Sequence, residues 1–318
     1  AKSSPGLSSA VTALVGVANE AVGANMRWQS LPQPFEVYAD GIDLVVFEEF
    51  GAGEAALHLK DEVARNELMR DEAYRRRFRK DYTRRFSPRV WQRDFHDTEI
   101  VACPDESLVG KSFGAVADAR GIHPVDAFLD LVVAYGTGVR WRTTIANHRP
   151  RELAHIVNHP SVQISFSDAG AHLRNMAFYN FPLQFLRMVL RSHQVGAPIM
   201  SLERAVHRLT GELATWHGVD AGTLRVGDRA DLAVIDPSGL DEALNGYHEA
   251  PMDMLGGLRR MVRRNDRAVR ATMVAGEVVF HEGRFVDGFG ESHRYGQYLR
   301  AGATSRRAPS RVGAARAA

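Results

Sequence analysis

Residues 161–166 alternate polar and apolar side chains, which is the period of a β-strand. The predicted strand leads into Asp168, and Gly170 with its small neighbours then opens a loop that carries His172. In parallel α/β barrels the loops after the strands converge on one pocket, so a carboxylate at the C-terminal end of a strand is a candidate for catalysis. The alternative is an aspartate that caps the next helix.

The same patterning predicts helices and strands along most of the chain. Helices are predicted over 7–22 and 111–120, from Pro124 onward, over 149–158 and 181–190, and after Ser201 as a cap. Gly23 and Gly121 stand where the first two would end. Strands or extended segments are predicted over 25–29, 42–47 and 140–145. This strand–helix alternation favours a parallel sheet or barrel.

Residues 60–89 are strongly charged, and many of their arginines stand among aromatic residues. Basic residues with aromatics can indicate nucleic-acid binding. Here Phe78, Tyr82 and Phe86 recur every four residues, which is the spacing of one helix face. We therefore favour a helix that buries its aromatic face and leaves its basic face in solvent.

The pattern changes after Gly218, where short strands replace the strand–helix alternation. Residues 230–237 contain the short apolar run 232–235, and residues 269–274 and 277–280 flank Ala275 and Gly276 as in a β-hairpin. A small β domain is expected over 219–292. Residues 293–318 are rich in Ala, Ser, Gly and Arg, and are expected to be disordered.

Composition narrows the class of protein. The 318 residues carry a formal net charge of +2, which does not require a nucleic-acid partner. No apolar run approaches the ~20 residues that a membrane span needs, so no membrane partner is expected. The single Cys103 excludes an intrachain disulfide and fits the cytoplasm. The chain starts at Ala1 without an initiator Met, and we expect it to be the later part of a longer protein.

Several segments, in their order, resemble the amidohydrolase superfamily, and within it the branch of D-aminoacylases (N-acyl-D-amino-acid deacylases). The segments are Val109–Ser112, Gly121–Leu131, His159–Pro160, Ser167–His172, Ser201–Val206, Leu224–Leu232 and Met273–Val279. The resemblance covers about residues 100 to 300 and is looser before them. Its specificity comes from the long order of segments, since no single motif would suffice.

The resemblance implies an α/β fold: the C-terminal part of a TIM-like (β/α) barrel over 1–218, followed by a small β-sandwich domain over 219–292. The family's first barrel strand ends in a His-x-His metal pair, and no His-x-His occurs here. The chain thus resembles the C-terminal half of a deacylase. We expect the fragment alone to be inactive.

The resemblance also implies roles for three residues. Asp168 stands at the position of the family's catalytic aspartate, which transfers the proton and in some members binds metal. His172 and Asn147 are the candidate substrate-binding residues. The cofactor would be Zn²⁺ or another divalent metal, with most of its ligands outside this chain. A loop histidine held by the backbone is the alternative for His172. Arg174 could pair a substrate carboxylate or be a solvated surface residue.

The implied function is metal-dependent hydrolysis of non-peptide C–N bonds, with an N-acyl-D-amino acid or a related amide as the small-molecule substrate. One alternative is a hydrolase of cyclic amides, like a hydantoinase or dihydroorotase. The other is a catalytically incompetent binding or scaffold unit.

Overall fold

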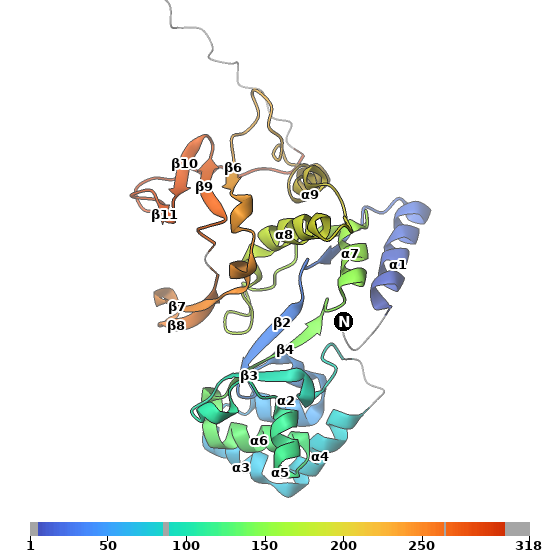
Figure 1. Ribbon diagram of the computed structural model, residues 1–318, viewed down its shortest axis with the longest axis vertical. Helices are drawn as coiled ribbons and strands as arrows, with labels where there is room; N and C mark the ends of the chain where they lie inside the picture. Colours follow the sequence, from blue (N-terminus) through green and yellow to red (C-terminus); the bar gives the residue numbers. More distant parts are fainter. Residues whose placement is uncertain (1–5, 85–88, 264, 303–318) are drawn as a thin grey trace, which may run out of the picture.

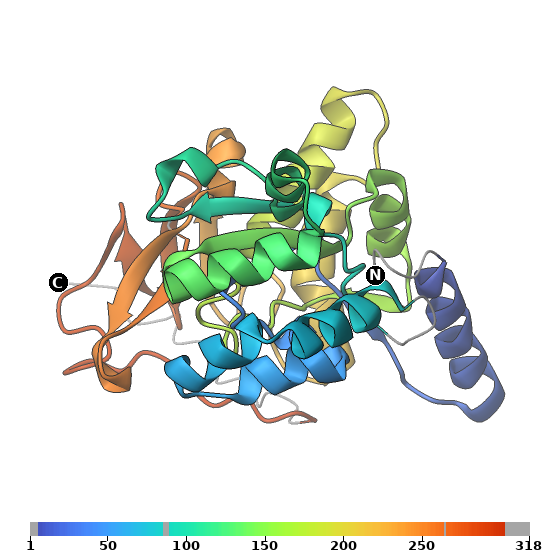
Figure 2. The same cartoon turned by 90° about the horizontal axis from the view of Figure 1, so that it is seen from below.

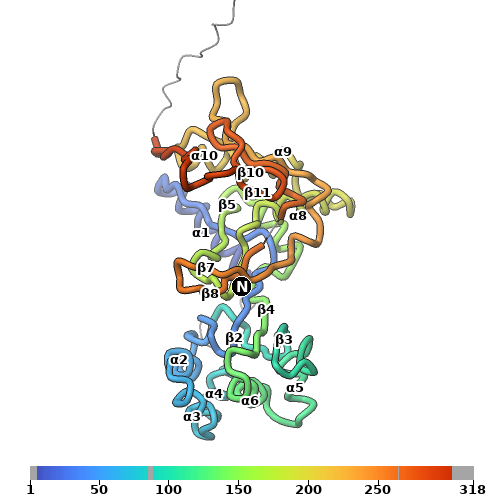
Figure 3. Tube along the Cα trace, turned by 90° about the vertical axis from the view of Figure 1, so that its left-hand side faces the viewer, coloured from blue at the N-terminus to red at the C-terminus, as the bar shows by residue number. Residues whose placement is uncertain are grey.

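The computed structural model describes residues 6–84, 89–263 and 265–302. Two units follow one another along its long axis (Figure 1), and the tube in Figure 3 shows that β2 and β4 join them. The helices are α1 (Leu7–Val22), α2 (Gly51–His58), α3 (Glu62–Arg70), α4 (Glu72–Thr83), α5 (Phe113–Arg120), α6 (Pro124–Tyr135), α7 (Pro150–Asn158), α8 (Phe181–Gln194), α9 (Leu202–Leu209) and α10 (Gly211–His217). The strands are β1 (Trp28–Ser30), β2 (Phe35–Asp40), β3 (Thr98–Ala102), β4 (Arg140–Ala146), β5 (Val162–Ile164), β6 (Leu232–Ile235), β7 (His248–Met252), β8 (Leu258–Val262), β9 (Val269–Val274), β10 (Glu277–His281) and β11 (Arg284–Phe285).

The first unit packs α2–α6 against a three-stranded antiparallel sheet in the order β2-β4-β3. Seen from below in Figure 2, these helices lie side by side. Their core is aromatic: Phe128 of α6 stacks on Phe47 and Phe95, and its ring also meets Trp141 of β4. All four of these side chains are fully buried. These rings all come from this unit, so it encloses a core of its own. Large buried aromatic rings contribute strongly to the stability of such a core.

Helix α4 confirms the buried aromatic face that was predicted for the basic segment, whereas its basic face is not wholly in solvent. Tyr74 and Phe78 of α4 are buried in the aromatic core, which is the face that the four-residue spacing indicated. On another side of the helix, Arg75 Nη2 lies 2.7 Å from Asp130 Oδ1 of α6. Phe86 lies outside the described residues. The basic surface is thus partly used inside the fold.

The second unit holds the parallel pair β1–β5, in which Trp28 stands opposite Val162. Helix α1 ends, as predicted, at Gly23, whose φ of 63° is the left-handed conformation that glycine adopts without strain. Ser201 caps α9, also as predicted, by accepting the backbone N–H of Arg204. Helices α7 and α8 and the apolar side of α9 bury Ile164 of β5 in a small core.

The last part of the chain forms a four-stranded antiparallel sheet in the order β11-β10-β9-β6. Its hairpin turns at Ala275 and Gly276, with φ of 53° and 89°, and this confirms the predicted turn. Ile235 and Val269 pack this sheet near α8. The ribbon β7–β8 was not predicted, and its Met261 packs on Tyr38 of β2.

Three expectations about the fold are wrong. Residues 42–47 form no strand, because Val46 and Phe47 enter the aromatic core through a short 3-10 helix, Val45–Glu49. The strand–helix alternation favoured a parallel sheet, but β4 is antiparallel to both of its neighbours, and only β1 and β5 of the described strands pair in parallel. The expected part of a barrel is not shown, because the strands of the described residues form separate sheets. The described part of 219–292 forms one four-stranded sheet and a separate ribbon, not the two facing sheets of a sandwich.

The division into 1–218, 219–292 and 293–318 stays a prediction, and 303–318, where disorder was expected, lies outside the described residues. Of the helices in the described part of the chain, none has the length and apolar character to cross a membrane.

Candidate functional site

Asp168 stands four residues beyond the end of β5, in the loop after the strand and directly before a turn at Ala169 and Gly170. Its φ of 52° lies in the left-handed region, which Asp and Asn adopt more readily than other side chains. Its Oδ2 lies 3.5 Å from Nε2 of His172, and the Asp168 side chain is 42% exposed. The two residues that the sequence singled out in this loop are therefore brought together at the surface.

The loop around Asp168 is held on both sides. Ala169 is fully buried, and its carbonyl accepts the Tyr179 hydroxyl at 2.9 Å. The carbonyl of His172 accepts the backbone N–H groups of Asn175 and Met176 at 2.9 and 3.0 Å. These contacts hold the backbone of the loop at Ala169 and at His172, and the side chains of Asp168 and His172 are both partly exposed to solvent.

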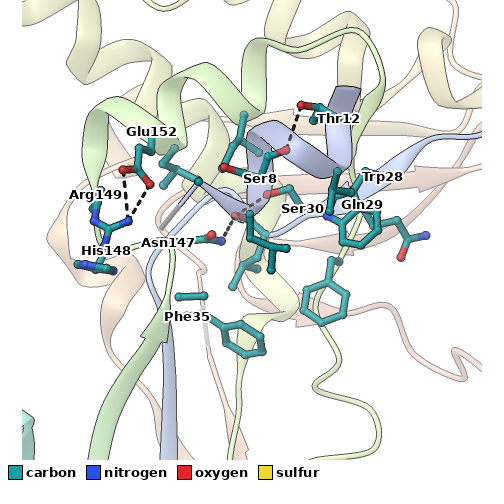
Figure 4. Close-up of a pocket in the computed structure, with 18 of the residues that line it drawn as sticks. Ser8, Thr12, Trp28, Gln29, Ser30, Phe35, Asn147, His148, Arg149 and Glu152 are labelled. Atoms are coloured by element: carbon teal, nitrogen blue, oxygen red, sulfur yellow. Dashed lines mark hydrogen bonds and ion pairs between the residues drawn. The ribbon is translucent and has the colours of Figure 1, made fainter. Parts of the chain in front are cut away.

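Asn147 directly follows β4 and also has a left-handed backbone, with φ of 58°. Its Nδ2 donates to the Leu31 carbonyl at 2.8 Å. Beside it lies a cavity of about 320 Å³ (Figure 4). The lining residues come from α1, β1, the start of β2, the end of β4, α7 and neighbouring loops: Gly6, Leu7, Ser8, Val11, Thr12, Trp28, Gln29, Ser30, Leu31, Phe35, Val90, Ala146, Asn147, His148, Arg149, Glu152, Leu153, Ile156 and Phe166.

The cavity and the Asp168–His172 pair do not share lining residues, although the cavity is lined by a residue close to Asp168 in the sequence. Phe166, two residues before Asp168, lines the cavity, whereas Asp168 and His172 do not. The ring of Phe166 lies 5.6 Å from that of Phe35, which also lines it. No pattern in the sequence pointed to Trp28, Phe35 or Phe166, because only the folded chain brings these distant apolar residues together.

Arg174 is neither a free surface residue nor open to a ligand. Its Nε donates to Asp40 Oδ2 at 2.8 Å, and its Nη1 lies 2.8 Å from Glu249 Oε2. Burial acts to lower the pKa of its guanidinium, but the hydrogen bonds that it donates to Glu249 and Asp40 outweigh this and raise that pKa. Arg174 therefore joins β2 to β7, and both sequence-based alternatives for it are wrong.

The described residues do not form a complete metal site by themselves. They contain no group of three or more His, Cys, Asp and Glu side chains placed to hold an ion. A catalytic zinc takes three protein ligands, and the loop offers only the carboxylate of Asp168 and the imidazole of His172. Most ligands were expected outside this chain.

Comparison with known proteins identifies relatives that are similar in sequence. No family model matches the chain. Uncharacterized proteins of Mycobacterium tuberculosis (strain H37Rv) and Mycobacterium bovis are each 59% identical to it over 292 residues. The match covers 90% of this chain and 48% of each relative, so the chain spans about half the length of the curated relatives it matches.

Among solved structures, the chain is similar to a D-aminoacylase that defines a subset of amidohydrolases, with a TM-score of 0.37 and 18% identity over 64% of this chain and 37% of that one. It is also similar to the N-acyl-D-glutamate deacylase of Bordetella bronchiseptica, complexed with zinc and a phosphonate inhibitor, with a TM-score of 0.38 and 20% identity over 65% of this chain and 38% of that one. Likeness at this level is too weak to establish a shared fold or activity.

Proposed function

We propose that this chain is part of a hydrolase of non-peptide C–N bonds, and that its substrates are N-acyl-D-amino acids. The observation that carries the proposal is the Asp168–His172 pair, whose Oδ2 and Nε2 atoms lie 3.5 Å apart in a loop that is partly exposed to solvent. The order of sequence segments that resembles the D-aminoacylases supports the substrate class. The single Cys103 supports a cytoplasmic location.

In this proposal Asp168 is the proton-transfer residue. Amide hydrolysis needs a base that takes a proton from water and delivers it to the leaving nitrogen. The Asp168 carboxylate is exposed enough to meet a substrate, and it lies within reach of His172 Nε2. His172 orients this carboxylate or contacts the substrate, and Asn147 binds the substrate beside the cavity.

A divalent metal such as Zn²⁺ belongs to the proposal only for the protein at its full natural length. Since the described residues supply one carboxylate and one imidazole, the remaining ligands would have to come from elsewhere. The same observation favours a second candidate, a binding or scaffold unit without catalysis.

The test is Asp168→Asn in the protein at its full natural length, assayed for amine release from N-acyl-D-amino acids, their L-enantiomers and cyclic amides. We expect kcat to fall by about 10²–10⁴-fold, because the variant keeps the size of the side chain but loses the base. His172→Ala should act mainly on KM, as expected of a residue that positions substrate.

Asp118→Asn is the matched control. It makes the same chemical change on α5, where the Asp118 side chain is 69% exposed. Wild-type kcat in Asp168→Asn would remove Asp168 from the mechanism. If the wild-type protein hydrolyses none of these amides, the scaffold candidate replaces the enzyme.

A further inference from the structure

The cavity beside Asn147 is lined mainly by apolar side chains. Leu7 and Val11 of α1 form one wall, and Trp28, Phe35 and Phe166 come from the strand ends. Its volume of about 320 Å³ lies at the lower end of the range for small-molecule pockets, about 300–1,000 Å³. A short alkyl chain or one aromatic ring matches this size and character.

The charges in the lining are paired with each other. Arg149 Nη1 lies 3.2 and 3.0 Å from the two carboxylate oxygens of Glu152, on the side of the cavity opposite Trp28 (Figure 4). An arginine neutralised in this way offers little attraction to a ligand's carboxylate. The cavity is therefore suited to the uncharged end of a ligand.

Asn147 supplies a fixed polar group at the edge of this apolar space. Its Nδ2 is engaged by the Leu31 carbonyl, which holds the side-chain amide in place. Its Oδ1 is then the atom that can accept an N–H from a ligand. One oriented polar group in an apolar lining is the usual design of a pocket that binds small molecules.

We infer that this cavity holds the acyl group of an N-acyl amino acid, with the substrate's amide N–H donating to Asn147 Oδ1. The inference rests on the proposed function and deepens it. An N-acyl amino acid carries its charge on the amino-acid side and none on the acyl side, so the acyl side fits the paired charges of the lining. Phe166 connects this lining to the segment that carries Asp168.

Binding without turnover tests the inference. N-acetyl-, N-butanoyl- and N-hexanoyl-D-alanine are titrated into the chain by calorimetry, and the fluorescence change that is lost in Trp28→Phe serves as a local readout, because Trp28 is one of four tryptophans. The affinity should rise about fourfold per added methylene, which corresponds to about 0.8 kcal/mol per buried CH₂. D-Alanine without an acyl group should show no such binding.

Val11→Phe should fill the cavity and abolish the dependence on chain length. Val17→Phe is the matched control, because Val17 is on the same helix but 61% exposed and outside the lining. Ile156→Phe should fill the cavity from the side of α7, and it replaces Val11→Phe as the test variant if Val11→Phe does not fold.

Affinity that is independent of chain length, or equal effects of Val11→Phe and Val17→Phe, would overturn the inference. Failure of the proposed function looks different: the ligands bind with the expected dependence, but Asp168→Asn leaves the hydrolysis rate unchanged.

Discussion

The first unit, which contains α2–α6 and is called the helical unit below, and the second unit, which carries Asp168, differ in how well each buries its own apolar surface. In the helical unit, Phe47, Phe95 and Phe128 are fully buried and pack ring against ring. In the other unit, α1 leaves Leu14 68% and Val22 78% exposed, and β10 fully buries only Val279. Because burial of apolar surface is the main source of stability, we expect the unit with the candidate chemistry to be the less stable of the two.

The largest expected effect therefore belongs to the aromatic core. Phe128→Ala should lower the free energy of unfolding by about 3–5 kcal/mol, because it removes a ring that stacks on two others and leaves a cavity. Urea unfolding measures the total loss, and hydrogen exchange shows whether the amides of α6 and β4 lose protection.

Phe285→Ala is the matched control in the other unit. Its side chain is 57% exposed, although its ring stacks on Phe289 at 4.8 Å. We expect a loss of about 1 kcal/mol or less. Equal losses for the two variants would contradict the difference in burial between the units.

The two units are joined by a cluster of charged residues. Asp40 of β2 accepts hydrogen bonds from Arg140 Nη1 and Arg174 Nε, and only 8% of the Arg140 side chain is exposed. Asp40→Asn should cost about 3 kcal/mol, because it leaves the buried Arg140 without its main counter-charge. Thermal unfolding monitored separately in each unit shows whether the units also come apart.

Asp241→Asn provides the comparison for this change. Asp241 pairs with Arg267 at 2.9 Å, but the two side chains are 39% and 70% exposed. Such a surface pair contributes about 0–1 kcal/mol. If both variants lose the same free energy of unfolding, burial does not determine how much the ion pair between Asp40 and Arg140 contributes to stability.

The sequence predicted well what is decided locally. Gly23, Gly121 and Ser201 end or begin helices through their own backbone or side chain, and Ala275 and Gly276 fit a tight turn. The closeness of Asp168 and His172 is also local, since four residues separate them.

What the sequence did not predict depends on distant contacts. Alternation identified β4 as a strand but cannot tell parallel from antiparallel pairing, and its partner residue Asp40 stands 100 residues before Arg140. Residues 42–47 have the composition of a strand, yet the aromatic core takes Phe47 into a helical turn. The cavity is lined by α1, β1 and α7, and no local sequence pattern indicates that these elements lie together.

The smallest effect tests how the helical unit responds to pH. His123 caps α6 through Nδ1, which accepts the Val125 N–H at 3.1 Å and must be unprotonated to do so. Burial lowers the pKa of His123, Asp126 opposes this, and Arg79 adds to it. The folded protein thus disfavours the charged imidazole. Its contribution to stability is present above the unfolded pKa of about 6.5 and is lost as the pH falls below it.

His123→Asn isolates this contribution, because Asn caps helices well but does not titrate. At pH 7.5 the variant should unfold within about 0.5 kcal/mol of the wild type. Between pH 7 and 5 the wild type should lose stability faster than the variant, as measured by urea unfolding at each pH. Parallel pH profiles would show that the cap survives protonation. In that case this part of the helical unit would not depend on the neutral imidazole.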